Sequence, residues 1–277
     1  MLIDNLQKTY FSNKEKNPVV TRNILKETIQ FYILDFVYKS IWGEDFILKG
    51  GTCLRFCFGL PRLSEDLDFD IENFKKFSLD NFLVDLENYF KKTLQFNKIN
   101  IKRANNKRTV YLKFPILLDI GININRGESN VLIIRLDLAP TIGKNYKTEV
   151  SIKSTDDFSF LIKRYSLPDL FAGKLAAILT REAMFGKTKR ERFKGRDFFD
   201  LIWFLEKKIK PNWIYLKEII GFDKKEMLKK LEHKISKVDS NLLTSDLTPF
   251  FEDKKFVDQF ITNFKNLFQN YSIILNE

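Results

Sequence analysis

The sequence has few of the side chains that thiol, imidazole or zinc chemistry requires. Among 277 residues there are two cysteines, Cys53 and Cys57, and one histidine, His233. These are too few for a Cys/His zinc site, and two cysteines four apart in an expected helix indicate reduced core thiols of a cytoplasmic protein. A Ser–His or Cys–His mechanism would depend on His233, which lies among charged residues, so these enzyme classes are disfavoured.

Long apolar segments are also missing. No run approaches the ~20 residues that cross a bilayer, so we expect no membrane association through a spanning helix. The first residues, 1–5, are not a basic region followed by an apolar core, and we expect no signal peptide. With 44% hydrophobic and 30% charged residues, the composition is that of a globular protein rather than a disordered one.

Acidic residues are outnumbered by basic ones. Lysine and arginine total 47 against 36 aspartates and glutamates, a formal net charge of +11. Such an excess favours an acidic partner, either nucleic acid or phosphates. A proteome that is rich in lysine throughout would produce the same bias, so charge alone does not distinguish a nucleic-acid-binding protein.

The spacing of apolar residues predicts an N-terminal α/β part and a C-terminal helical part. Helices are predicted over 20–42, 52–58 and 79–94, and strands over 46–49, 66–71, 99–104, 109–114 and 131–138, with a turn at 105–107. From Ser166 the pattern is helical to the end, and Ser166-Leu-Pro-Asp169 is typical of a helix start. We therefore expect domains at 1–163 and 164–277, the second completing a site in the first.

The strongest local signal is Gly50-Gly51-Thr52, followed by Asp66-Leu67-Asp68. The glycines come between a strand and a helix, with Thr52 as the expected helix cap, and they let backbone amides approach a phosphate at the helix N-terminus. Asp66 and Asp68 share one face of a strand, with Cα atoms ~6.6 Å apart, a spacing that suits a divalent cation. The alternative is an exposed sheet edge that also includes Asp70.

Transfer of a phosphate-bearing group to a hydroxyl needs a third acid that orients or deprotonates the attacking hydroxyl. Two residues are candidates for that role. Asp137 lies near the end of the apolar strand 131–138, where a charged group rarely occurs without a partner or a metal. Asp119, in Ile-Leu-Leu-Asp-Ile, is the alternative. We prefer Asp137, although an ion pair with Arg135 would also explain it.

The C-terminal part contains a second group of charged residues. Lys174 and Arg181 share a helix face, and Asp197 and Asp200 lie on a helix side suited to packing. Such carboxylates need buried cations as partners. Either Lys174 binds a triphosphate, with the aspartates orienting it, or the group is a structural ion-pair network; for Asp200 the structural alternative is at least as strong.

Two basic segments could contact a phosphate backbone. Residues 88–118 contain eight lysines and arginines, no acids, and interleaved aromatic residues. Residues 181–196 are also basic. The candidate nucleic-acid contacts are Lys102, Arg103, Lys107, Arg108, Lys187, Lys189, Arg190, Arg192 and Lys194, unless both segments are simply solvated surface.

Together these motifs resemble the AbiEii/AbiGii-like nucleotidyltransferase toxins of abortive-infection and toxin–antitoxin systems, which include the MenT toxins. The likeness rests on Leu48-Lys-Gly-Gly-Thr-Cys-Leu-Arg55 and Arg62-Leu-Ser-Glu-Asp-Leu-Asp-Phe69, and more loosely on 174–181 and 196–201; it reaches from about residue 40 to 205. It implies an α+β fold: a polymerase-beta-type core, a mixed sheet flanked by helices, with a C-terminal helical region.

The resemblance also implies roles for residues. The nucleotide-binding set would be Gly50, Gly51, Thr52, Arg62, Ser64, Lys174 and Arg181. Asp66 and Asp68, with Asp137 less securely, would bind Mg²⁺ or Mn²⁺, and Lys174 and Asp197 would complete the catalytic set. The substrates would be an NTP and the tRNA 3′ end, translation would be blocked in toxin–antitoxin or phage-defence systems, and a cognate antitoxin would neutralise the toxin. The alternatives are nucleotidylation of a protein or small molecule, and a non-enzymatic module that binds RNA or a partner.

Overall fold

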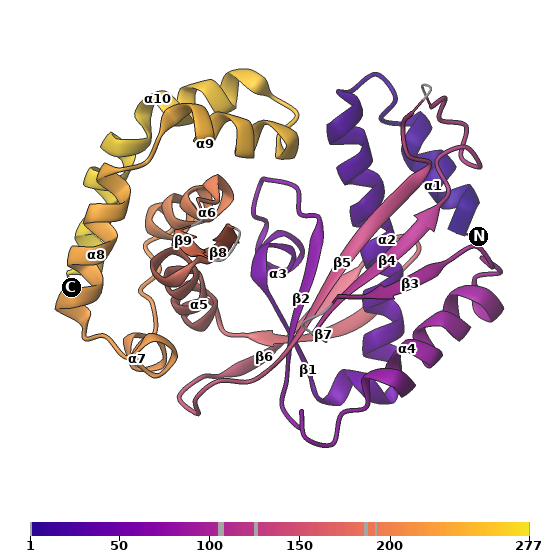
Figure 1. Cartoon of the computed structure of the whole chain (residues 1–277), viewed down its shortest axis with the longest axis horizontal. Coiled ribbons are helices and arrows are strands. Elements are labelled where there is room, and N and C mark those ends of the chain that lie inside the picture. Colours follow the sequence, from indigo (N-terminus) through magenta and orange to yellow (C-terminus); the bar gives the residue numbers. More distant parts are fainter. Residues whose placement is uncertain (1, 105–107, 125–126, 186–187, 192, 277) are drawn as a thin grey trace. The chain divides into compact units, whose positions relative to one another are not determined.

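Two compact units make up the chain (Figure 1). The computed structural model describes residues 2–104, 108–124, 127–185, 188–191 and 193–276, and for 182–191 it describes the backbone. Unit 1 consists of Met1–Thr141 and Val150–Arg164, and unit 2 of Ile142–Glu149 and Tyr165–Glu277.

Unit 1 is built on a seven-stranded mixed sheet. Its helices are α1 (Leu2–Phe11), α2 (Pro18–Lys39), α3 (Gly50–Phe58) and α4 (Leu79–Asn88). The strands are β1 (Phe46–Lys49), β2 (Asp66–Ile71), β3 (Asn100–Arg103), β4 (Thr109–Pro115), β5 (Val131–Pro140), β6 (Thr148–Ser154) and β7 (Ser159–Tyr165). Their order is β3-β4-β5-β2-β1-β7-β6; β2 pairs with β1 antiparallel and with β5 parallel.

The central strands separate an apolar face of the sheet from a polar one. Because side chains alternate along a strand and registered partners share a face, the residues paired with Leu67 and Phe69 lie on the same side. That side is almost completely buried: Phe46, Leu48, Leu67, Phe69, Ile71, Val110, Leu112, Phe114, Ile134, Leu136 and Leu138. The opposite face carries the three aspartates of β2. The apolar face therefore fixes the register that brings the polar residues together.

Unit 2 is mainly helical. It contains α5 (Leu167–Thr180), α6 (Gly195–Glu206), α7 (Trp213–Ile220), α8 (Lys224–Ser236), α9 (Ser240–Leu247) and α10 (Lys254–Tyr271). Between α5 and α6 is a hairpin of β8 (Glu182–Phe185) and β9 (Thr188–Glu191). In Figure 1, α7 to α10 curve around α5 and α6. The two inner helices are held by the stacked rings of Phe171 and Phe204, with centroids 4.4 Å apart.

The structure confirms the fold class and most of the elements expected from the sequence. The strand 46–49 has the bounds predicted, and α2, α4 and β2 to β5 agree within a few residues. The expected turn at 105–107 lies outside the described residues. Helices α1 and strands β6 and β7 were not predicted.

Two local predictions are wrong. The chain is not helical throughout from Ser166, because β8 and β9 interrupt the helices in a stretch that has no apolar stripe at helical spacing. Thr52 is not the cap of α3, which begins two residues earlier and has Lys49 at its N-cap position. The Thr52 side chain points into the protein interior instead, where it is completely buried.

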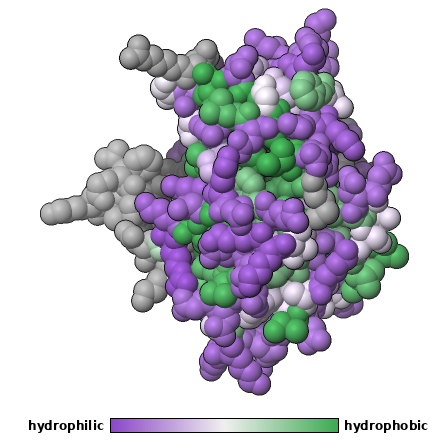
Figure 2. Space-filling view, turned by 90° about the vertical axis from the view of Figure 1, so that its right-hand side faces the viewer, coloured by the Kyte–Doolittle hydropathy of each residue, from purple (hydrophilic) through white to green (hydrophobic). Residues whose placement is uncertain are grey.

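One side of unit 1 presents a largely polar surface (Figure 2). Figure 2 shows the side on which α1, α4 and β3 lie, with hydrophobic side chains in small, separate groups. Over the ranges that the structure describes, no helix is long and apolar enough to cross a membrane.

Candidate active site

The acidic residues of unit 1 lie in one neighbourhood on the polar face of the sheet. Asp68 of β2 is in register with Asp137 of the parallel strand β5, and Asp66 is in register with Arg135. Registered residues on adjacent strands have side chains ~5 Å apart. The Arg135 guanidinium lies 2.8 Å from Asp137. Although burial opposes the charge, Asp137 and then Asp66 raise the pKa of Arg135, so both acids act on this cation.

Asp137, rather than Asp119, is brought beside the acids of β2. Asp119 lies in the turn after β4, where Lys98 approaches its carboxylate to 2.8 Å. Asp137 is held from the other side by Thr109, whose hydroxyl donates a hydrogen bond of 2.5 Å. The ion pair between Arg135 and Asp137, which was the alternative explanation for Asp137, is therefore present. It lies next to the pair of acids Asp68 and Asp137.

Two glycines at the start of α3 make room for functional side chains. Gly50 has a φ of +73°, and a Cβ added to it would lie 2.2 Å from Asp68 Oδ2. A Cβ on Gly51 would lie 2.5 Å from Arg62 Nη2. A larger residue at either position would displace the Asp68 carboxylate or the Arg62 guanidinium. The glycine pair is therefore required by close approach as well as by the turn.

The N-terminus of α3 suits an anion. Its N-cap residue, Lys49, makes no side-chain hydrogen bond to the helix. The first backbone N–H groups of a helix have no partner within the helix and carry partial positive charge, so they bind phosphate oxygens well. In unit 1 this helix end adjoins the carboxylates of β2, since Gly50 contacts Asp68.

Thr52, Arg62 and Ser64 form a buried polar network rather than an open surface. The Thr52 hydroxyl donates to the backbone oxygen of Asp66 at 2.5 Å and lies 2.8 Å from Ser64 Oγ. Arg62 donates to its neighbour's carbonyl oxygen, and the Ser64 amide donates to Glu27 Oε1 at 3.0 Å. These side chains fix the loop before Asp66 and so position the first acid of β2.

Asp70, the third acid of β2, has a structural partner. It is buried, and Lys49 Nζ lies 2.6 Å from its carboxylate. Lys49 is also in register with Asp68, so its ammonium belongs to the same polar face. The exposed-edge alternative does not apply, because β2 has a partner strand on each side.

The donors around Asp66 and Asp68 suit a hard divalent cation. Within the part of the chain that the structure describes, no three acidic, histidine or cysteine side chains are grouped closely enough to enclose a metal. Mg²⁺ commonly takes only one or two protein carboxylates, with substrate phosphates and water completing its shell. Because Gly50 lacks the Cβ that would displace Asp68 Oδ2, the glycine preserves the position of that carboxylate. The residues present therefore fit such an ion.

Unit 2 contains a buried group of charges between α5 and α6. Lys174 Nζ lies 3.0 Å from Asp197 Oδ1 and 2.8 Å from Asp200 Oδ2, and Arg181 Nη2 lies 2.8 Å from Asp197 Oδ2. Asp200 is completely buried. The guanidinium of Arg196, the second residue of α6, lies 4.1 Å from the centroid of the Phe250 ring. The geometry is that of an ion-pair network joining two helices.

The field inside unit 2 is positive. Burial alone would raise the pKa of Asp197, but Lys174, Arg181 and Lys194 hold it well below its usual range. Burial lowers the pKa of Lys194 to about 8, and Arg196, Lys174 and Arg181 contribute to the shift while Asp197 opposes it. Because the cations destabilise one another, a bound anion would stabilise this cluster.

The predicted nucleic-acid contacts are only partly described. Lys102 and Arg103 are exposed on β3, an edge strand, and Arg103 is paired with Asp80; Arg108 is exposed at the start of β4. Lys194 is half-buried before α6. Three further candidates, Lys107, Lys187 and Arg192, lie outside the described residues. Lys189 and Arg190 belong to β9, of which only the backbone is described.

Sequence reasoning missed the residues that support the site. Glu27 and Gln30 of α2 bond the amide and the carbonyl oxygen of Ser64, and Thr109 bonds Asp137. Glu27 and Gln30 are polar positions three residues apart among the apolar residues of α2. That interruption of an apolar helix face was the available signal. Thr109 carries no comparable signal, because its role depends on the register of β4 with β5.

The sequence matches a family model over most of its length. The family model described as "Nucleotidyl transferase AbiEii toxin, Type IV TA system" matches residues 33–270. The chain therefore belongs to the AbiEii nucleotidyltransferase toxin family of toxin–antitoxin systems, and this membership implies a cognate antitoxin. No curated protein matches the sequence.

One of the similar solved structures shows a shared fold at low sequence identity. MenT4, a nucleotidyltransferase toxin from Mycobacterium tuberculosis H37Rv, is 13% identical, with a TM-score of 0.53, over 99% of this chain and 92% of that one. JHP933 from Helicobacter pylori is 17% identical, with a TM-score of 0.47, over 90% of this chain and 93% of that one. A further H. pylori structure, titled a putative nucleotidyltransferase, is 17% identical with a TM-score of 0.46, over 90% and 96%.

Replacing Gly50 with alanine should abolish activity, whereas the same change at Gly59 should not. Both glycines have a left-handed φ, +73° and +72°, so each alanine costs about 1–3 kcal/mol of backbone strain. Only the alanine at 50 meets Asp68; nothing lies within 4 Å of a Cβ at 59. Urea unfolding and nucleotide incorporation measure the two effects separately. Equal activity of G50A and G59A would contradict the assigned role of Gly50.

Replacing Lys174 with methionine should destabilise unit 2 by about 3–5 kcal/mol, because two buried carboxylates lose the ammonium beside them. Adding Asp200→Asn should recover part of that loss, measured by urea unfolding, with D200N alone as the control. If Lys174 also binds phosphate, the double variant regains stability without activity. Recovery of both would make Lys174 purely structural.

Proposed function

We propose that this protein transfers a nucleoside monophosphate from an NTP to the 3′ end of an RNA, most favourably a tRNA, and so blocks translation in the cytoplasm. The observation that carries the proposal is the register of β2 and β5, which sets Asp68 beside Asp137 next to the N-terminus of α3. Carboxylates beside unpaired helix amides suit a nucleotide whose phosphates arrive with a divalent cation.

The residues divide the work as follows. Asp66 and Asp68 would hold Mg²⁺ or Mn²⁺, which when bound neutralises the phosphates and the developing charge. Asp137 orients or deprotonates the attacking hydroxyl. The amides of Gly50 and Gly51 bind the phosphates. Because Thr52, Arg62 and Ser64 are buried, they position these amides and do not contact the ligand themselves.

We also assign roles to residues of unit 2, because their motifs follow those of unit 1 in the order that the family resemblance implies. Lys174 and Arg181 would neutralise nucleotide phosphates, and Asp197, held ionised by these cations, would keep both of them oriented. The exposed Lys102, Arg103 and Arg108 offer contacts to an RNA backbone. The excess of basic residues in the chain favours such a negatively charged partner.

Incorporation of each α-labelled NTP into total tRNA with Mg²⁺ tests the proposal. The wild type should label tRNA from a preferred NTP. Asp66→Ala should lower the rate at least ~100-fold, because it removes a ligand of the cation that stabilises the charge of the transition state. Asp137→Asn should have a similar effect. Its matched control, Asp119→Asn, should retain activity, because Asp119 lies in the turn after β4 and forms an ion pair with Lys98.

Three outcomes would contradict parts of this assignment. Undiminished labelling by D66A would exclude the acids of β2 from the reaction. Label on protein or a small molecule, with tRNA unlabelled, would change the acceptor. No label from any NTP, and no rise in melting temperature with Mg²⁺ and NTP, would favour a non-enzymatic binding module.

A further inference from the structure

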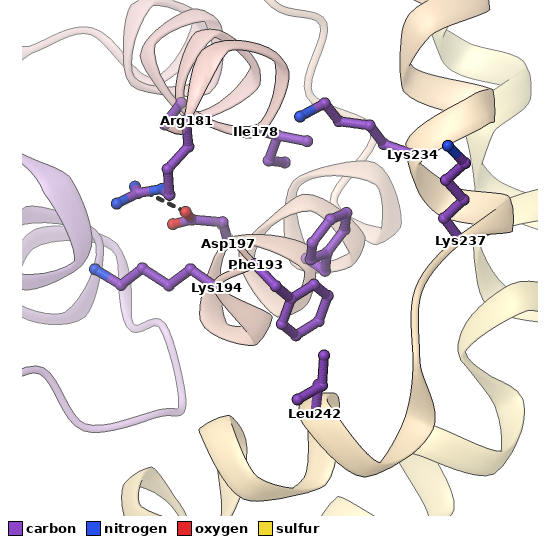
Figure 3. Close-up of a pocket in the computed structure, with 10 residues that line it drawn as sticks. Ile178, Arg181, Phe193, Lys194, Asp197, Lys234, Lys237 and Leu242 are labelled. Atoms are coloured by element: carbon purple, nitrogen blue, oxygen red, sulfur yellow. Dashed lines mark ion pairs between the residues drawn. The ribbon is translucent and has the colours of Figure 1, made fainter. Parts of the chain in front are cut away.

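A pocket of about 240 Å³ opens within unit 2, among α5, α6, α8 and α9 (Figure 3). Four of its lining residues are cations: Arg181 at the end of α5, Lys194 at the start of α6, and Lys234 and Lys237 at the end of α8. Asp197 is the one acid among the residues that line it. Lys234 and Lys237 lie in a part of the sequence where no motif indicates function.

The arrangement of these charges favours an anion. In Figure 3, Arg181 and Asp197 are joined as an ion pair, and Lys234 extends from the α8 side toward Ile178 of α5. Asp197 is already shared between Arg181 and Lys174, so its charge is divided among the cations around it. Burial, and then Arg196, Lys174 and Arg181, lower the pKa of Lys194 to about 8, so these cations also act on one another.

The remaining walls are apolar and include an aromatic ring. Phe193, half-buried, stacks on Phe198 with centroids 5.2 Å apart and planes at 17°. Cations beside an aromatic ring are the usual elements of single-stranded nucleic-acid sites, because phosphates and base faces are recognised together. The volume is below the ~300–1,000 Å³ of pockets that enclose a whole drug-sized ligand, so it suits part of a longer chain.

We propose that this pocket binds a backbone phosphate of the single-stranded end of the RNA acceptor, with Lys234 and Lys237 as the phosphate contacts. The assignment rests on the proposed function for the identity of the ligand. An RNA strand is favoured over a whole NTP because the cavity is smaller than the pockets that enclose a complete small ligand, and because cations and an aromatic ring line it together.

Binding of a short fluorescein-labelled single-stranded RNA to the full-length protein, without NTP, tests this proposal. The variant is K234A/K237A, and the matched control is K225A/K229A, which removes two exposed lysines of the same helix that do not line the pocket. Fluorescence anisotropy across a series of salt concentrations gives the Kd and its salt dependence. Melting temperatures of both variants measure any structural effect, since cations at a helix C-terminus also stabilise the helix.

We expect the pocket variant to bind RNA about tenfold or more weakly than wild type, with the slope of log Kd against log salt reduced by ~0.7 for each lost contact. The control should change little, and both melting temperatures should stay close to that of the wild type. Unchanged RNA affinity, or equal losses in variant and control, would overturn the proposal. So would a loss of affinity that merely follows a lower melting temperature.

Titration of each NTP with Mg²⁺ into the same proteins separates the two sources of phosphate. Weakened NTP binding with RNA binding intact would assign the pocket to the triphosphate and overturn the RNA assignment. The outcome is independent of turnover: RNA binding through the pocket without any labelling of RNA would contradict the proposed reaction alone. Labelling of RNA at the wild-type rate and affinity by K234A/K237A would contradict only the pocket.

Discussion

The burial of one face of strand β2 is the constraint on which the candidate site of unit 1 depends. Leu67 and Phe69 are completely buried and are in register with Leu136 and Leu138 of β5. A slip of one residue would place every apolar side chain of the strand on the polar face, at a cost of several buried groups. The register that apolar packing enforces is therefore the register that sets Asp68 beside Asp137.

Carboxylates gathered in this way repel one another, and the structure offsets that repulsion with fixed cations. Arg135 lies beside Asp137 in the same strand, and Lys49 pairs with Asp70 on β2. Both cations sit on the same sheet face as the acids they balance, so the face is neutralised locally without burying an isolated charge. The close contact of Gly50 with Asp68 leaves that carboxylate directed toward the N-terminus of α3.

The parts of this architecture that follow from local sequence could be predicted, and those that follow from register could not. Alternation in 66–71 and the Gly-Gly turn are local signals. From them β2, a helix after the turn and the position of Asp66 and Asp68 on one face could be predicted, although α3 begins at Gly50 rather than at Thr52. Thr52 reads locally as a cap, yet its hydroxyl is used in a tertiary hydrogen bond to the Asp66 carbonyl oxygen. Asp137 could be preferred over Asp119 from its place in an apolar strand, but its position beside Asp68 depends on which strand pairs with β2.

In unit 2 the situation is reversed, because several cations surround the buried acids Asp197 and Asp200. Asp197 and Asp200 share Lys174, while burial, and then the neighbouring cations, lower the pKa of Lys194 to about 8. A protein that needed these charges only to join α5 to α6 could have reached neutrality with fewer cations, or with apolar residues at no loss of stability. The cations near Lys194 repel its ammonium, and a bound anion would offset that repulsion. The ion pairs therefore serve packing, while the surplus cations point to a phosphate-bearing ligand.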